Sequence, residues 1–252
     1  LVKGHSGYAF AVHETVYLKD RLSGVSKQDS QSFQRALIHY SKAVKYGLEY
    51  LKINDLNYFD FKHVMREEGI PDYLSTNLSE NQRDLETMLF LGQSLGAIVN
   101  FQKENMMMVS QLPIVKGIFD WVCGIKRDIN GGACEIFYGA YEAGRPKMLG
   151  GNPQKGKKIF KRAIKKYPHN WLIRVAYLEY FALPMSDEQA YEKQKFFLEK
   201  KAEQLKNYKR WAPDDNNDKK KEDAFENKSL RAFQAIAIKR FHFIKKYESE
   251  YF

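Results

Sequence analysis

The sequence predicts an all-α fold made of tetratricopeptide-like antiparallel helix pairs, with about ten helices in an α-α superhelix. Three observations support this prediction. Long segments repeat apolar residues with the 3.6-residue period of a helix. All seven prolines lie at expected element boundaries, where they do not interrupt a helix. No segment alternates apolar and polar residues for long enough to indicate a sheet.

The stretch from Asn152 to Pro168 gives the most specific signal in the chain. Asn152 can cap a helix, and Pro153 suits the first helical position because its missing N–H would be unpaired there anyway. The spacing Gly-x3-Phe-x2-Ala-x4-Pro over residues 156–168 is typical of the second helix of a tetratricopeptide unit, with Gly where Ala is usual. The face opposite the apolar one is basic and carries Lys157, Lys158, Lys161, Arg162, Lys165 and Lys166.

The earlier part of the chain contains further helical patterns. A capping box, Ser79-x-x-Gln82, marks the start of one of them. Gly92 and Gly96 in that helix lie four positions apart, so another helix can pack closely against them. Pro71 marks the end of the preceding helix. We expect helices over about Tyr8–Leu22, Ser30–Ile53, Tyr58–Glu68 and Ser79–Asn100, and from Pro113 through Trp121.

The later part continues in the same way. A second capping box, Ser186-x-x-Gln189, predicts the start of a long helix to Tyr208. The polar, charged residues Ala212–Asp223 predict a mobile loop at 212–223. We expect the other helices over about Gly131–Ala143, Pro153–Pro168, Asn170–Phe181 and Ser229–Tyr247. The whole chain, 1–252, is then one helical-repeat domain.

Composition and charge narrow the class of protein. The chain has 252 residues, of which 44% are hydrophobic and 14% aromatic, so it is globular and not disordered. Its net charge of +10 is compatible with nucleic acid or an anionic surface as partner. Acidic residues accompany the lysines along most of the chain, and no nucleic-acid motif is present. We therefore interpret the basic helix face as solvated and expect no nucleic-acid partner.

The N-terminus and the two cysteines indicate the cellular compartment in which the protein is expected. The chain begins at Leu1 without Met, which indicates a trimmed mature segment. No signal peptide and no apolar run of about 18 residues is evident. An export signal or lipid anchor would then lie upstream. Cys123 and Cys134 are expected to be two buried thiols, with a disulfide as the alternative in an oxidising compartment.

Motifs for catalysis are absent or incomplete. Gly151-x4-Gly156-Lys157 begins a P-loop pattern, but Lys158 stands where Ser or Thr must hold magnesium, and Pro153 removes an N–H from the phosphate cradle. The six histidines form no metalloprotease pair, and no serine-nucleophile elbow occurs. We expect a non-catalytic protein with no cofactor and no metal site.

An aromatic stretch is the candidate ligand site. Tyr138 and Tyr141, followed by Arg145, can hold an apolar ligand with a carboxylate head. Trp121 is assigned to the same aromatic lining. The alternative is that the tyrosines pack in the core and Arg145 offsets the C-terminal dipole of its helix.

The order of several short motifs resembles the T component of TRAP transporters, a family of helical periplasmic lipoproteins related to tetratricopeptide repeats. Each motif is short, and together they run along nearly the whole chain. They are Gly7-Tyr8-Ala9-Phe10, Arg35-Ala36-Leu37-x2-Tyr40-x5-Tyr46-Gly47-Leu48, Leu112-Pro113, Gly139-Ala140-Tyr141-Glu142 to Arg145-Pro146, Leu149-Gly150-Gly151-Asn152-Pro153 leading into Phe160-x2-Ala163, and Ala235-Ile236-Ala237-x2-Arg240 through Tyr251-Phe252.

The resemblance implies a periplasmic accessory subunit without enzymatic activity. It would have an all-helical fold with a central cavity, associate with a substrate-binding (P) protein and, in some members, form a homotrimer. A small organic ligand and a lipid anchor upstream of Leu1 belong to the same expectation. Gly156 stands where the family usually has Ala, and the lower helix propensity of glycine is expected to reduce the local stability of its helix. The alternative function is a cytoplasmic tetratricopeptide-type scaffold that binds a peptide or an acidic partner.

Overall fold

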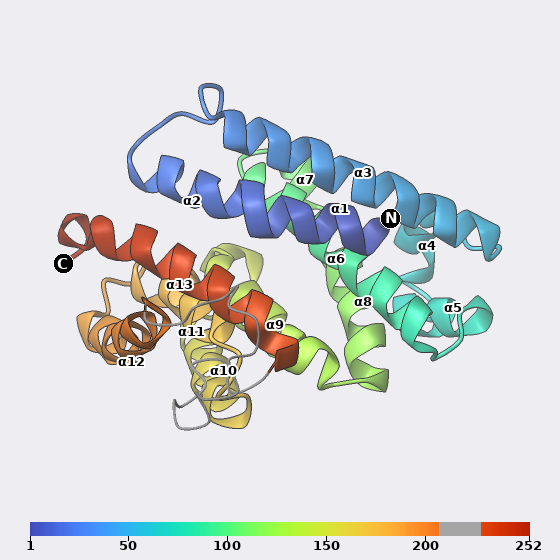
Figure 1. Cartoon of the computed structure of the whole chain (residues 1–252). Coiled ribbons are helices and arrows are strands. Elements are labelled where there is room, and N and C mark those ends of the chain that lie inside the picture. Colours follow the sequence, from blue (N-terminus) through green and yellow to red (C-terminus); the bar gives the residue numbers. More distant parts are fainter. Residues whose placement is uncertain (207–227) are drawn as a thin grey trace, which may run out of the picture. The chain divides into compact units, whose positions relative to one another are not determined.

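The computed structural model describes residues 1–206 and 228–252, which form two compact units, Leu1–Ile129 and Asn130–Phe252 (Figure 1). These described residues contain helices and turns and no strand, so the predicted all-α class is confirmed. The tetratricopeptide-like stacking and the single domain over 1–252 stay predictions. The loop predicted at 212–223 lies outside the described residues.

Unit 1 is built around the long helix α3 (Gln31–Ile53). An N-terminal helical run packs along α3, α6 contacts both, and α8 packs on the other side of α6 (Figure 1). Its other elements are α1 (Val2–Tyr8), the π-helical turn η1 (Ala9–Glu14), α2 (Thr15–Leu22), η2 (Tyr58–Asp60), α4 (Phe61–Val64), α5 (Ile70–Asn77), α6 (Gln82–Phe101), α7 (Met106–Val109) and α8 (Leu112–Ile125).

Two glycines allow α6 and α8 to approach closely, as the sequence predicts. A methyl group added at Gly92 would lie 3.1 Å from the ring of Phe119, and one at Gly96 would lie 3.4 Å from Val115. Phe119 and Val115 are buried residues of α8. The predicted close helix contact is therefore confirmed, and α8 is the helix that makes it.

An aromatic cluster forms the core where α2, α3 and α6 meet. The rings of Tyr17, Phe33 and Phe101 lie with centroids 5.1–5.4 Å apart, and Tyr40 lies 5.9 Å from Phe101. All four side chains are buried. Aromatic pairs at this separation add about 0.5–1.5 kcal/mol each to the burial of their area. This cluster fixes the N-terminal helical run against α3.

Unit 2 contains the predicted helix from Pro153. Asn152 caps it by accepting a hydrogen bond from the backbone N–H of Lys155 at 2.9 Å, as the sequence predicts. Helices α9 and α10 pack together, the run α11–η5 packs on both, and α12 and α13 follow (Figure 1). The elements are η3 (Ile129–Gly131) at its start, α9 (Ala133–Gly144), η4 (Lys147–Leu149), α10 (Pro153–Lys166), α11 (Leu172–Tyr177), the π-helical turn η5 (Leu178–Ala182), α12 (Glu188–Lys206), η6 (Lys228–Leu230), α13 (Arg231–Lys246) and η7 (Glu248–Glu250).

The contact between α9 and α10 explains the glycine at 156. A methyl group there would lie 2.8 Å from Ala143 Cβ and 2.9 Å from the carbonyl oxygen of Gly139. A methyl group at Gly139 would lie 2.6 Å from the ring of Phe160. Gly156 thus provides the close approach of the two backbones, which offsets its lower helix propensity.

The two predicted capping boxes are wrong in their cap residues. Helix α6 is capped by Asn81, whose side-chain oxygen accepts from Asp84 N at 2.9 Å, and not by Ser79. At α12 the side chain of Asp187 accepts from Ala190 N at 2.9 Å, whereas Ser186 has a positive φ of 46° in the preceding turn. In both cases an amide or carboxylate oxygen slightly later in the chain takes the place predicted for a serine hydroxyl.

Several helix boundaries also differ from the prediction. The first helical run begins at Val2 and not near Tyr8, since the segment before it also packs on α3. The segment predicted as helix over 58–68 is η2 followed by α4, which ends at Val64. Helix α5 was not predicted, because Pro71 opens a helix at its first turn as readily as it ends one.

The stretch Met106–Ile125 is long and apolar enough to cross a membrane by length and composition alone. This differs from the prediction that no such run exists. The stretch contains Lys116 and Asp120, whose side chains pair at 2.5 Å. Most of α8 within it is buried in unit 1, as is usual for a helix at the centre of a folded unit.

The cysteines differ from the expected free thiols. Cys123 and Cys134 are both disulfide-bonded, and the chain has no other cysteine. Both side chains are buried. The spacing of two cysteines does not reveal redox state, so the alternative stated from the sequence is the one found.

Candidate functional site

The predicted site residues on α9 lie against one another. The guanidinium carbon of Arg145 is 3.7 Å from the ring centroid of Tyr141. Phe137 continues the row, with its ring 5.5 Å from Tyr141 and 5.2 Å from Tyr138. All of these side chains are partly buried. The structure therefore brings three of the four predicted residues into one aromatic row that ends in a cation.

Arg145 also shapes the turn after α9. Its side chain donates to the carbonyl oxygens of Tyr141 at 2.8 Å, Leu149 at 2.8 Å and Gly150 at 3.2 Å. A guanidinium has five N–H groups, of which three donate in this turn, and Nη2 also lies 3.9 Å from a carboxylate oxygen of Glu142. The bond to Tyr141 satisfies an end carbonyl of α9, as expected from the alternative reading of Arg145. A ligand role for Arg145 stays a prediction.

Trp121 lies on α8 in unit 1. Its side chain is 3% exposed, and its indole N–H donates to the hydroxyl of Ser75 on α5 at 2.9 Å. Burial of an indole with its N–H paired is typical of a core position. The assignment of Trp121 to a ligand lining stays a prediction.

Two hollows lie on the surface of unit 1. The larger, about 470 Å³, is lined only by residues of α3 and follows one side of that helix. The smaller, about 290 Å³, lies between α1 and α3 and is lined by Leu1, Gly4, His5, Tyr8 and His39. The second hollow combines apolar, aromatic and imidazole groups, which is the mixture that small-molecule sites use.

Three histidines gather beside the smaller hollow. The Nδ1 atoms of His5 and His39 are 2.9 Å apart, so one ring donates and the other accepts. His13 stacks on His39 with centroids 5.5 Å apart, and Tyr8 contacts both rings edge-on at 4.8–4.9 Å. The search for a metalloprotease histidine pair in the sequence did not reveal this cluster. His5 and His39 are 34 positions apart, and no local pattern connects them.

The electrostatics of the cluster keep two rings neutral. Burial lowers the pKa of His39 below its ordinary 6.5, and the neighbouring His5 and His13 lower it further. Burial also lowers the pKa of His13, with a contribution from Arg35. Neutral imidazoles both donate and accept, so the cluster can bind a neutral or acidic polar group at neutral pH.

The family assignment follows from a comparison with protein-family models. The model for the TRAP transporter T-component matches residues 1–200. The chain belongs to this family. No curated protein matches it. The match includes all four predicted site residues and the histidine cluster of this T-component, and it ends before the motifs at 235–252.

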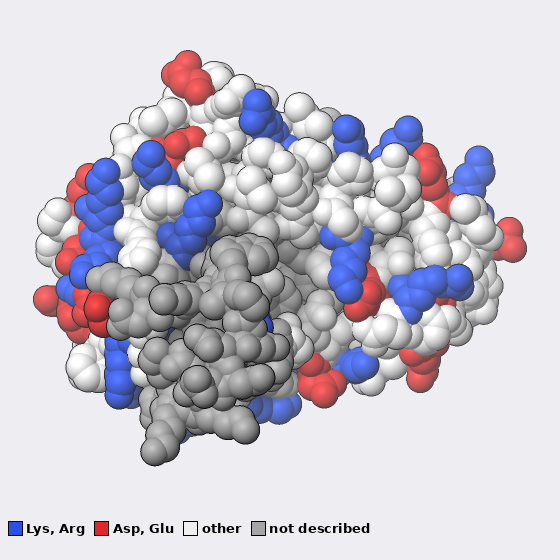
Figure 2. All heavy atoms as spheres, viewed as in Figure 1, with Lys and Arg blue, Asp and Glu red and all other residues white. Residues whose placement is uncertain are grey.

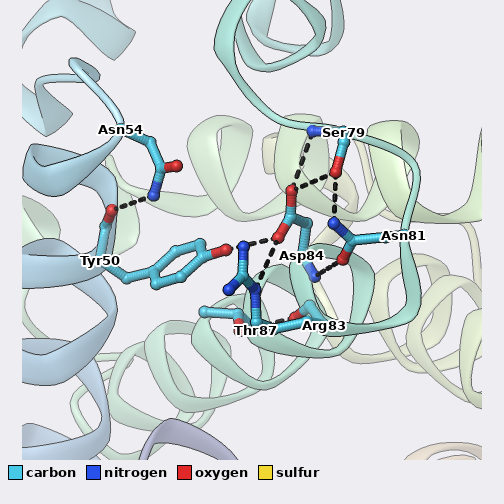
Figure 3. Close-up of polar contacts among 7 residues, drawn as sticks. All are labelled: Tyr50, Asn54, Ser79, Asn81, Arg83, Asp84 and Thr87. Carbon is cyan, nitrogen blue, oxygen red and sulfur yellow. Dashed lines mark hydrogen bonds and ion pairs between the residues drawn. The ribbon is translucent and has the colours of Figure 1, made fainter.

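A buried carboxylate at the start of α6 is a structural centre of this T-component. Asp84 is 3% exposed and accepts hydrogen bonds from the phenol of Tyr50 and from the backbone N–H and hydroxyl of Ser79 (Figure 3). Burial alone would raise the pKa of Asp84, but these bonds and one from Arg83 hold it below its ordinary value. Both carboxylate oxygens accept hydrogen bonds, and the bond from Tyr50 of α3 lets Asp84 stabilise the junction of α3 with α6.

The part of the chain that the structure describes contains no set of side chains suited to bind a metal ion. No group of three or more His, Cys, Asp or Glu side chains there could hold a metal ion. The rings of His13 and His39 stack, and His5 hydrogen-bonds to His39. The cluster suits hydrogen bonding better than coordination.

Proposed function

We propose that this T-component is a non-catalytic periplasmic accessory subunit of a TRAP-type solute uptake system. It docks the substrate-binding (P) protein and shelters a small apolar or carboxylate ligand. The match of the T-component model over residues 1–200 carries the proposal, because it covers about four fifths of the chain and names the transport system.

The disulfide supports the periplasmic compartment. Cys123 and Cys134 are both disulfide-bonded and buried. Structural disulfides persist in oxidising compartments such as the bacterial periplasm and are rare in the cytosol. In this proposal a lipid anchor upstream of Leu1 holds the protein at the membrane. The cytoplasmic scaffold function does not account for the disulfide.

The aromatic row on α9 supports the ligand part of the proposal. Tyr138 and Tyr141 offer apolar ring faces, and in this proposal a ligand carboxylate binds the guanidinium of Arg145 in competition with Glu142, which lies 3.9 Å away. Trp121 contributes apolar area in the same proposal. The ligand would be held mainly by ring contacts and oriented by one charged hydrogen bond.

Docking can be tested with the purified chain and the P protein of its own transport system. We expect size-exclusion chromatography with light scattering to show a complex at micromolar concentration, and to show whether the T-component alone is a trimer. Absence of a complex with the native P protein at 50 µM (~10 times a weak-complex Kd of a few micromolar) would refute docking. Binding of acidic peptides in place of the P protein would favour the scaffold function.

The ligand can be tested separately by native mass spectrometry of the purified protein. We expect a bound small molecule that is lost in Arg145→Gln, because the charge-assisted contact is removed. Lys147→Gln, two residues along in the same turn and exposed, is the matched control and should keep the molecule. Equal retention by all three proteins would place the ligand elsewhere.

A further inference from the structure

Helix α10 has an exposed basic face without carboxylates. Between Pro153 and Lys166 the helix contains no Asp or Glu. Its buried residues face α9 and α11, so its apolar side is already covered inside unit 2. Elsewhere, on the face shown in Figure 2, basic and acidic side chains alternate over the surface. The basic face of α10 is therefore a local concentration of positive charge.

Four cations on this face are available to a partner. Lys158, Lys161, Arg162 and Lys165 are exposed, and none has an ion pair among the described residues. They follow the i, i+3, i+4, i+7 spacing of a single helical stripe. Over this spacing the helix rises about 10 Å, which is similar to the Debye length at 0.1 M salt, so the four charges act together. We call these four residues the basic stripe.

Two other lysines of α10, Lys155 and Lys157, are paired with carboxylates, and Lys166 lies 5.0 Å from the ring centroid of Tyr167. Lys155 lies 2.6 Å from a carboxylate oxygen of Glu142. Lys157 forms an ion pair with Asp187 and lies 5.0 Å from the ring centroid of Phe181. These ion pairs give Lys155 and Lys157 a structural role within unit 2, whereas the four residues of the basic stripe form no ion pair among the described residues.

The composition of the stripe indicates which kind of anion it fits. Protein interfaces are enriched in arginine and aromatic residues and depleted in lysine, whereas three of these four cations are lysines. Neither of the two hollows described above, which lie on unit 1, is on α10. Flexible point charges on a convex helix suit a broad, fluid layer of phosphates, which needs no shape complementarity.

We propose that the basic stripe of α10 binds the anionic phospholipid headgroups of a membrane surface. The helix lies on the membrane without inserting, because its apolar face is buried within the protein. The contact orients unit 2 on the surface and does not depend on the P protein. It is thus separate from the proposed accessory function, and either can fail without the other.

The test is sedimentation of the 252-residue chain, carrying no lipid, with vesicles of 30% phosphatidylglycerol in phosphatidylcholine. Each cation near an anionic surface raises the partition coefficient about fivefold. The quadruple variant K158Q/K161Q/R162Q/K165Q is therefore expected to bind several hundredfold more weakly. Glutamine keeps the helix propensity and removes the charge. Binding of the wild type should also fall steeply between 0.05 M and 0.5 M salt.

The matched control carries four exposed lysines changed elsewhere, K19Q/K52Q/K193Q/K200Q, with the same change in net charge. We expect it to retain at least one fifth of the wild-type partition coefficient. Circular dichroism should show equal helix content in all three proteins. Equal losses in both variants, or equal binding of the wild type to pure phosphatidylcholine, would overturn the proposal. Binding to polyglutamate but not to vesicles would also overturn it and favour an acidic protein.

Discussion

The guanidinium of Arg240 donates to the carboxylate of Glu179 at 2.6 Å, and the two side chains are only 3% and 6% exposed. The pair joins α13 to the π-helical turn η5 within unit 2. Removing one partner of such a buried pair takes the counter-charge away from the other, at a cost of about 3–5 kcal/mol. We expect Arg240→Met to lower the free energy of unfolding by about this amount in a urea titration.

A neighbouring residue provides the control for this pair. Lys239 is exposed on the same helix, so Lys239→Met should change the free energy of unfolding by less than about 0.5 kcal/mol. The double variant Glu179→Gln/Arg240→Met removes both charges and should recover part of the loss. If Arg240→Met and Lys239→Met were equally stable, the buried pair would contribute nothing to folding.

The histidine cluster predicts a dependence of stability on pH. The folded-state pKa values of His13 and His39 lie below 6.5, so the unfolded chain binds more protons in this range. Their contribution is complete above pH 6.5 and is lost as the pH falls through the folded values. We expect the urea midpoint to decrease from pH 7.5 to pH 5.5, above the range in which carboxylates titrate.

Substitution identifies the groups behind this slope. His39→Gln cannot protonate, so it should flatten the pH dependence between 7.5 and 5.5. His63, 74% exposed in its side chain, offers the comparison, and His63→Gln should keep the full slope. A slope that is unchanged in His39→Gln would assign the effect to other groups.

Two glycines in helices should respond in opposite directions to alanine. At Gly156 the added methyl group meets Ala143 Cβ at 2.8 Å and backbone atoms of α9 at 2.9 Å, so Gly156→Ala should destabilise the protein by about 1–3 kcal/mol. At Gly7 in α1 nothing lies within 4 Å, so Gly7→Ala should stabilise it by about 0.5–1 kcal/mol. Thermal unfolding of both variants checks the signs. Stabilisation in both would mean that α9 and α10 pack less closely.

The disulfide should be needed for full stability. The variant Cys123→Ser/Cys134→Ser is expected to lose about 2–4 kcal/mol of unfolding free energy, because the unfolded chain regains freedom. Thiol titration of the denatured wild type without reductant should detect no free thiol. Two titratable thiols in protein purified from the periplasm would contradict the disulfide.

Local patterns predicted the helices whose ends carry their own signals. Asn152 and Pro153 placed α10 correctly, and the start of α3 at Ser30 follows from the same kind of cap. Prediction of helix boundaries failed where a residue suits two roles, or where two neighbouring residues could each serve as the cap. Pro71 suits a helix start as well as a stop, and Asn81 took the cap expected at Ser79.

In the candidate site, the sequence could predict the proximity of residues on one helix but not contacts between residues far apart in the chain. Tyr138, Tyr141 and Arg145 lie within two helical turns, so their proximity follows from the helix itself. Trp121 has its polar partner at Ser75, 46 positions away, and sequence spacing cannot show that its indole is buried and paired. The histidine cluster likewise depends on the packing of α1 on α3.

The π-helical turn η1 has a consequence for the register of the N-terminal run. A π-helical turn accommodates one more residue than an α-helical one. If η1 were ordinary α-helix with all its residues retained, the whole of α2 would be rotated by about 100° relative to α1. Tyr17 would then leave the aromatic core. The wide turn thus absorbs one extra residue and keeps both α1 and α2 of this continuous helical run in contact with α3.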